Sequence, residues 1–142
     1  MKRADRSRVL SSLDYLEKEL SFLSEYEQEV SWKVYQTQRS KRLETERWVE
    51  GLINAALDIS KVLLAIRSEE IPETSREILF KVGSFVFDKE AEAEAFSELA
   101  KIRNTLAHRY LDIKWEDIKR FMHLASESYP LYIHFVKREL EE

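Results

Sequence analysis

Three residues in the segment Lys101–Tyr110 have the side chains that RNA cleavage without a metal ion requires. From Arg103 onward the segment reads R-N-x-x-x-H-x-Y. An Arg holds phosphate oxygens with a permanently charged fork, and a His transfers protons near neutral pH. An Asn orients the His or the substrate. Arg103, Asn104 and His108 therefore predict a site at which a ribose 2′-hydroxyl attacks the neighbouring phosphate.

Helical geometry limits how these side chains meet. At about 100° per residue, Asn104 and His108 lie about 40° apart on the helix surface. Three apolar residues point to the opposite side, into the core: Leu99, Ile102 and Leu106. Arg103 lies about 140° from His108, so one straight helix does not aim both at one phosphate. Either the helix ends before His108, or two chains combine their motifs in a dimer. We favour the dimer, in which paired His108 residues share the acid and base roles.

Local charge favours an RNA contact near this motif. The whole chain has a formal net charge of −4, so it does not attract nucleic acid by its overall charge. Residues 98–120 hold six bases and four acids, and six minus four gives +2. We expect Lys101, Arg109 and Lys114 of this segment to bind RNA.

The elements that position the motif are predicted to be helices. The 142 residues include only two glycines and two prolines, and 35% of them are charged, which suits long helices with short connections. Apolar residues at three- and four-residue steps predict three helices: one from about residue 6 into the thirties, one over 41–67, and a short one around 78–86 that Gly83 weakens. Thr74 or Ser75 is expected to cap the third.

The second half of the chain is predicted to add two more helices. Asp88 is expected to cap a fourth helix over residues 89–109. A break at 110–112 leads to a fifth helix, with Asp112 as its cap and Pro130 kinking or interrupting it. The expected fold is all-α: an up-and-down bundle of four or five helices, forming one domain over 1–142.

Several classes of protein are disfavoured by the composition. The chain has no cysteine, which excludes disulfides and thiolate-metal sites, and no spacing of His and carboxylates predicts a metal site. No apolar run approaches the roughly 20 residues that span a bilayer, and the basic N-terminus lacks the apolar region of a signal peptide. We expect a cytoplasmic protein with no metal, no cofactor and no membrane contact.

The chain resembles the HEPN superfamily and, more narrowly, the HepT-type toxins encoded beside a minimal nucleotidyltransferase (MNT) antitoxin. The match includes the motif, the stretch ERWVEGLINAALDISKVLL, the connector IPETSREIL and the segment YLDIKWEDI. The resemblance implies a dimer with Arg103 and His108 as catalytic residues in its cleft and Asn104 in support. It also implies that the antitoxin transfers AMP from ATP to Tyr110. Where many relatives have Gly and an aromatic residue before Arg-Asn, this chain has Lys101-Ile102.

The function that follows from the resemblance is a toxin acting as a homodimer. It would be a metal-independent endoribonuclease that cleaves tRNA or mRNA and is neutralised by AMPylation of Tyr110. One alternative is a non-catalytic subunit that presents substrate or nucleotide to a partner nucleotidyltransferase. Another is a structural helical dimer that binds nucleotides.

Simpler roles are open for the individual residues. Arg103 would instead be a structural ion-pair partner of Asp58 or Glu98, His108 an ordinary surface histidine, and Tyr110 a ring that packs at a helix end. We assign no function to two further histidines: His123 and His134. Three tryptophans are expected to be core or interface aromatics: Trp32, Trp48 and Trp115.

Overall fold

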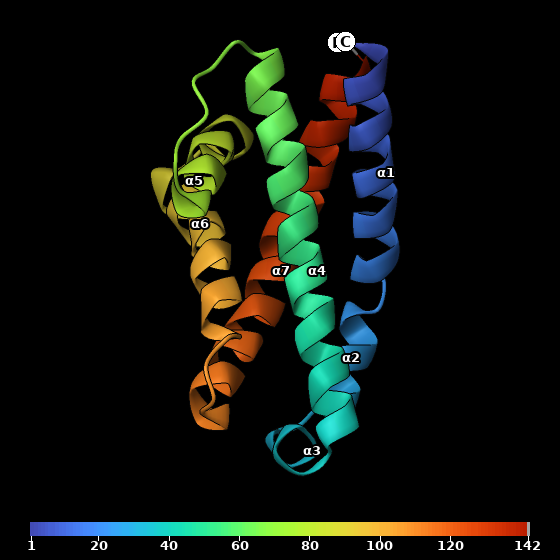
Figure 1. The fold of residues 1–142 in the computed structure, drawn as a ribbon, viewed down its shortest axis with the longest axis vertical. Coiled ribbons are helices and arrows are strands. Elements are labelled where there is room, and N and C mark those ends of the chain that lie inside the picture. Colours follow the sequence, from blue (N-terminus) through green and yellow to red (C-terminus); the bar gives the residue numbers. More distant parts are fainter. Residues whose placement is uncertain (142) are drawn as a thin grey trace.

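The computed structural model describes residues 1–141, and these form helices and connections without any strand (Figure 1). The helices are α1 (Arg3–Leu20), α2 (Leu23–Glu29), α3 (Trp32–Thr37), α4 (Arg39–Ile66), α5 (Ser75–Val86), α6 (Glu90–Thr105) and α7 (Leu111–Glu141). The prediction of an all-α chain is confirmed.

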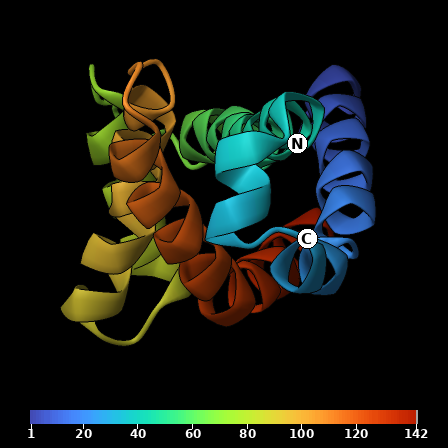
Figure 2. The ribbon, with the colours of Figure 1, turned by 90° about the horizontal axis from the view of Figure 1, so that it is seen from below.

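The long helices run up and down along one axis, as expected for a bundle. Figure 1 shows α4 and α7 in the middle, α1 on one side and the α5–α6 pair on the other. Figure 2, seen from below, shows α2 continuing the α1 side and α3 closing the lower end. The two ends of the chain lie together at the opposite end of the bundle (Figure 1), where the Arg6 guanidinium donates a hydrogen bond to the carbonyl of Leu140.

Two buried tyrosines join α7 to α4 across the core. The hydroxyl of Tyr129 donates to the carbonyl of Leu52 at 3.0 Å, and that of Tyr132 donates to the carbonyl of Ala56 at 2.8 Å. Both rings are fully buried. Because a buried hydroxyl without a partner is costly, these bonds fix the register of α7 on α4.

The predicted first helix is wrong in its length, because the chain breaks it into α1, α2 and α3. The apolar spacing continues through both breaks, so periodicity alone does not reveal them. At the first break, the carbonyl of Glu19 accepts a hydrogen bond from the indole Nε1 of Trp48 at 2.8 Å. At the second, the hydroxyl of Ser31 caps α3 by accepting from the amide of Val34. Side-chain bonds thus replace helical ones at these breaks.

The predictions for the next two helices are confirmed. The second corresponds to α4, and Thr74 caps α5 by accepting a hydrogen bond from the amide of Glu77 at 3.2 Å. Gly83 lies inside α5 and does not end it. A Cβ at this position would lie 3.1 Å from the Cα of Ala93, so the glycine lets α5 pack closely on α6.

Asp88 is not the cap of the fourth helix. The N-cap of α6 is Lys89, one residue later, and it makes no side-chain capping bond. Two carboxylates, Glu90 and Glu92, occupy the first turn instead. There they interact favourably with the positive end of the helix dipole, which lowers the need for a capping side chain.

The boundary predictions for the fifth helix are also corrected. Helix α7 begins at Leu111, so Asp112 lies in its first turn rather than at the cap. Pro130 lies inside α7 and does not interrupt it. A proline removes one helical hydrogen bond, but the Tyr129 and Tyr132 anchors hold the helix to α4 on either side of it. Tertiary packing therefore overrides the local preference.

Across residues 1–141, no helix combines the length and the apolar composition that crossing a bilayer requires.

Candidate active site at the end of helix α6

The motif lies where α6 ends and the chain turns into α7. The last helical residue is Thr105, and the amide of His108 donates to the carbonyl of Thr105 at 2.9 Å, a tight turn rather than a helical bond. The predicted continuation of the helix to residue 109 is therefore wrong. Leu106, the C-cap, is buried and fixes the turn against the core. The structure shows that the helix ends before His108, which is one of the two arrangements that the sequence left open.

Arg103 is half-buried and its guanidinium is held by two neutral side chains. Its Nη1 donates to the amide oxygen of Asn54 at 3.2 Å, and its Nη2 donates to the hydroxyl of Ser75 at 3.1 Å. No carboxylate among residues 1–141 pairs with it. The alternative ion pair with Asp58 or Glu98 is therefore wrong. Glu98 pairs with a different arginine on α7, and the positive charge of Arg103 stays un-neutralised.

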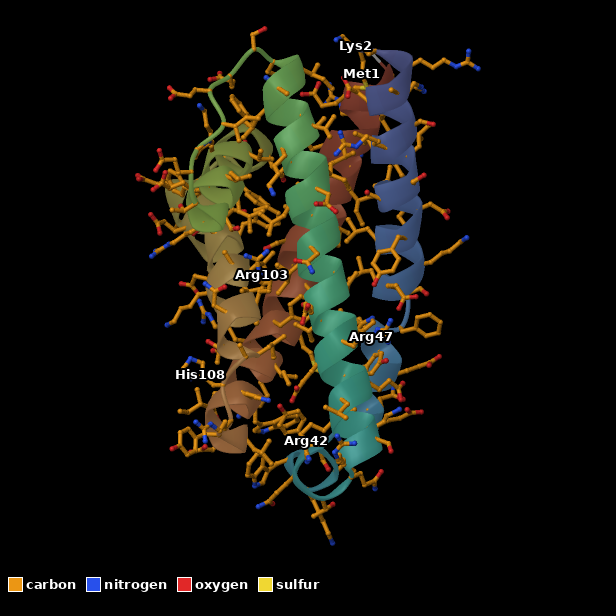
Figure 3. All side chains as sticks on the ribbon, viewed as in Figure 1. Met1, Lys2, Arg42, Arg47, Arg103 and His108 are labelled. Carbon is orange, nitrogen blue, oxygen red and sulfur yellow. The ribbon has the colours of Figure 1, made fainter. Side chains whose placement is uncertain are left out.

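The other three motif residues face solvent. Asn104, His108 and Tyr110 are exposed, and Tyr110 has 68% of its residue surface accessible. Figure 3 shows His108 at the lower end of α6 and Arg103 higher up, on the side toward α4. The two side chains make no contact with each other within one chain. The exposure of His108 leaves it accessible to a substrate or to a second chain.

Half of the bases between residues 98 and 120 are neutralised by ion pairs. Three pair with carboxylates: Lys114 with Glu46, Lys119 with Glu116, and Arg120 with Glu98. Lys101, Arg103 and Arg109 form no such pair within the described part of the chain. These three lie in the last turn and a half of α6 and in the turn after it, the segment that also carries His108. Free positive charge is thus concentrated at the motif.

Lys114, which the sequence predicted as an RNA contact, lies in a different setting from Lys101 and Arg109. Its side chain is only 13% exposed and its Nζ is 3.3 Å from Glu46 on α4. The hydroxyl of Tyr35 donates to the same carboxylate. Burial is the main cause that raises the pKa of Tyr35, and this hydrogen bond raises it further. Trp115 packs on the Tyr35 ring with centroids 5.3 Å apart. Lys114 and Trp115 therefore anchor the start of α7, and with it the turn that carries His108.

The predicted core role is confirmed for Trp48, whereas Trp115 is half-buried and Trp32 is exposed. Trp48 is buried and stacks on Tyr26, with ring centroids 4.2 Å apart. Trp32 lies 6.1 Å from Trp115 in the cluster at the lower end of the bundle. All three indoles pack against other aromatic rings.

A hollow of about 500 Å³ lies beside Lys101, between α5, α6 and α7, and this volume is within the range of small-molecule sites. Its charged lining consists of Arg76, Glu98, Lys101, Asp117 and Arg120. Arg76 and Arg120 are paired with glutamates, so Lys101 and Asp117 are the lining charges without an ion pair among residues 1–141. The hollow therefore has a charged lining of mixed sign.

Asn54 and Ser75 were not predicted as part of the site. Asn54 is a lone polar residue between two buried residues of α4, Ile53 and Ala55, and that isolation is the one signal the sequence offers. Ser75 directly follows the cap of α5, and nothing in its spacing relates it to Arg103. Among residues 1–141 no group of three or more potential metal ligands comes together.

Comparison with known proteins agrees with the motif and the fold. A family model described as ribonuclease HepT-like matches residues 16–138, which include the whole motif. The tRNA nuclease HepT of Aphanizomenon flos-aquae (strain 2012/KM1/D3) is 25% identical over 132 residues, covering 93% of this chain and 89% of that protein. The resemblance that the motif suggested is thereby confirmed, and the chain belongs to the HepT-like ribonuclease family of the HEPN superfamily.

Proposed function

We propose that this chain is an endoribonuclease that cleaves RNA without a metal ion, using Arg103, Asn104 and His108. One observation carries the proposal: three bases without ion-pair partners among residues 1–141 lie in the same segment, 101–109, as an exposed histidine at the end of α6. Positive charge that no carboxylate neutralises is available to attract and bind an anion. Because the chain belongs to a ribonuclease family, RNA is the anion that we propose it binds.

The chemistry begins at the ribose 2′-hydroxyl. A neutral imidazole of His108 takes its proton, and the oxygen attacks the adjacent phosphorus. The guanidinium of Arg103 stabilises the extra negative charge on the phosphate oxygens. The bond to the 5′-oxygen then breaks, and an imidazolium protonates the leaving oxygen. The products are a 2′,3′-cyclic phosphate and a 5′-hydroxyl, and Asn104 orients the imidazole or the substrate.

We propose that the complete site forms in a homodimer. Arg103 is turned toward α4 and α5, whereas His108 lies exposed beyond the helix end, so one chain does not present both to one phosphate (Figure 3). A two-fold axis near the end of α6 would bring a second copy of each residue to the same cleft. Paired His108 side chains would then supply the base and the acid.

The proposed substrate is tRNA, because the relative from Aphanizomenon flos-aquae is named a tRNA nuclease. A cleavable mRNA is the other substrate class. Lys101 and Arg109 are proposed to bind the phosphate backbone on either side of the cleaved bond. Lys114 contributes through its ion pair with Glu46, which holds the turn in place.

The chain is proposed to act in the cytoplasm as a toxin that an MNT-type nucleotidyltransferase neutralises by AMPylation of Tyr110. Tyr110 is 68% exposed and lies two residues from His108, so it is accessible to a modifying enzyme. Each AMP adds a phosphate charge and a base beside Arg109 and His108. The added group would compete with RNA for the same positive charge and fill the space before the imidazole.

The activity is tested with purified protein and a tRNA pool in excess EDTA. We expect wild type to cleave and His108→Ala to be inactive. His123→Ala, an exposed histidine of α7, serves as the matched control and should cleave like wild type. If wild type and His108→Ala behave alike, the enzymatic proposal fails, and a non-catalytic subunit of a nucleotidyltransferase becomes the better description.

The modification is tested by intact mass. The protein is incubated with the nucleotidyltransferase of the adjacent reading frame and ATP, and one or more AMP additions are expected. Tyr110→Phe should abolish them, whereas Tyr15→Phe, which alters another exposed tyrosine, should leave them unchanged. Additions that persist in Tyr110→Phe would place the modification elsewhere.

A further inference from the structure

Two side chains outside the motif hold the Arg103 guanidinium, one from α4 and one from α5. We propose that Asn54 and Ser75 are positioning residues, which aim Arg103 at the substrate phosphate without neutralising its charge. This inference rests on the proposed ribonuclease function and deepens it.

The two partners fix the guanidinium in two directions. Asn54 lies in the middle of α4, flanked by buried residues, and offers its amide oxygen to Nη1 at 3.2 Å. Ser75 is the first residue of α5 and offers its hydroxyl to Nη2 at 3.1 Å. The capping bond of α5 is made by Thr74, so the Ser75 hydroxyl remains available to Arg103. Because both partners lie on helices, the position they impose is rigid.

The hydrogen-bond count leaves room for a phosphate. A guanidinium has five N–H donors, and the structure assigns two of them to Asn54 and Ser75. A bidentate contact with phosphate needs two more, which the remaining donors supply. Half-burial reduces competition from water, so the contact with a phosphate would be stronger than on an open surface.

Both partners of Arg103 are neutral side chains, whereas Arg6 and Arg42 donate to neutral backbone carbonyls and other arginines bind carboxylates. Three others pair with carboxylates: Arg67 with Glu139, Arg76 with Glu94 and Arg120 with Glu98. An aspartate in place of Asn54 would keep the shape and the accepting oxygen and would strengthen the bond to Arg103. It would also compete with the phosphate for the charge. A site built for stability would favour the carboxylate, and a site built for an anion would favour the amide.

The decisive variant is therefore Asn54→Asp, compared with Gln28→Glu, which adds the same charge on the exposed face of α2. We expect Asn54→Asp to unfold at the same or a higher denaturant concentration than wild type. We expect its kcat/KM for RNA to fall on the order of 10- to 100-fold. Gln28→Glu should match wild type in both measurements. Full activity of Asn54→Asp, or a loss of activity that Gln28→Glu shares, would overturn the inference.

Ser75 is tested by rescue. Ser75→Ala should lower kcat, and Ser75→Thr, which keeps the hydroxyl, should restore most of it. The matched control is Ser84→Ala, an exposed serine of the same helix whose hydroxyl bonds only to the carbonyl of Phe80. Equal loss in Ser75→Ala and Ser75→Thr would contradict a role for the hydroxyl.

A binding experiment separates this inference from the proposed function. RNA affinity is measured in a His108→Ala background, which does not cleave, with and without Asn54→Asp. Weaker binding with Asn54→Asp supports the positioning role even if no variant cleaves RNA, in which case only the proposed activity fails. Equal affinity in the two proteins overturns the positioning role even if wild type is an active ribonuclease.

Discussion

Lys114 and Glu46 form an ion pair, with 3.3 Å between Nζ and Oε1, that joins the start of α7 to α4. Both side chains are nearly buried, at 13% and 12% exposure, and the Tyr35 hydroxyl donates to the same carboxylate. The ion pair lies in the first turn of α7, directly after the turn that carries His108 and Tyr110. It therefore links the stability of the fold to the placement of the motif.

Removing one partner of this ion pair should destabilise the fold. Lys114→Met leaves the Glu46 carboxylate nearly buried without its cation, and we expect a loss of about 3 kcal/mol in the free energy of unfolding. Urea denaturation measures it. Lys119→Met breaks an exposed pair with Glu116 and should cost no more than about 0.5 kcal/mol. The double change of Lys114→Met with Glu46→Gln should recover much of the loss, and no recovery would argue against the pair as the cause.

The sequence predicted the fold well where apolar spacing and helix type sufficed. The helix α4, the Thr74 cap and the buried face of α6 follow from local pattern, which short-range physics controls. The breaks in the first predicted helix do not follow from local pattern. At the first break, the hydrogen bond between Trp48 and Glu19 joins residues that are 29 positions apart. Pro130 shows the same limit: packing of the flanking tyrosines onto α4 holds the helix together.

The candidate site was predicted in its residue types and only partly in its geometry. The spacing of Arg103 and His108 suggested two ways to relieve their angular separation, and the actual end of α6 was visible only in the structure. The partners Asn54 and Ser75 are 49 and 28 residues away from Arg103, so no local pattern relates them to it. Which bases remain unpaired likewise depends on carboxylates from other helices.

Arg103→Lys should lose activity and keep the fold. Lysine retains the charge but lacks the planar fork, so it does not reach two neutral acceptors and a phosphate together. We expect kcat/KM for RNA to fall on the order of 100-fold while the free energy of unfolding changes by no more than about 1 kcal/mol. Arg39→Lys, at the exposed start of α4, is the control and should be unaffected. Wild-type activity in Arg103→Lys would mean that charge alone suffices.

Mixing two inactive variants tests whether the site spans two chains. Arg103→Ala and His108→Ala are unfolded together, refolded together and assayed on RNA. A shared cleft in the mixed dimer holds one intact Arg103 and one intact His108, so activity should rise above that of either variant alone but stay below wild type, because a single imidazole then serves as both base and acid. No rise above the parents would contradict a site that combines residues from both chains.

Stability should fall at alkaline pH because of the two core tyrosines. Burial raises the pKa of Tyr129 and of Tyr132 above the ordinary value near 10, so the folded state favours the protonated phenols. Their contribution is complete below about pH 10 and is lost as the pH rises toward the folded-state pKa values. Urea denaturation at increasing pH should show a decreasing free energy of unfolding above about pH 10, accompanied by tyrosinate absorbance on unfolding. Constant stability across this range would contradict the burial of these hydroxyls.

The most direct test of the account is cleavage of an RNA whose scissile nucleotide lacks its 2′-hydroxyl. Once the cleavage site is mapped in EDTA, the same oligonucleotide is made with a single deoxyribose there and incubated with wild type. The account predicts that the unmodified RNA yields a 2′,3′-cyclic phosphate and a 5′-hydroxyl, and that the deoxy position is not cut. Cleavage at the deoxy position, or cleavage that appears only when a divalent metal is added, would contradict it.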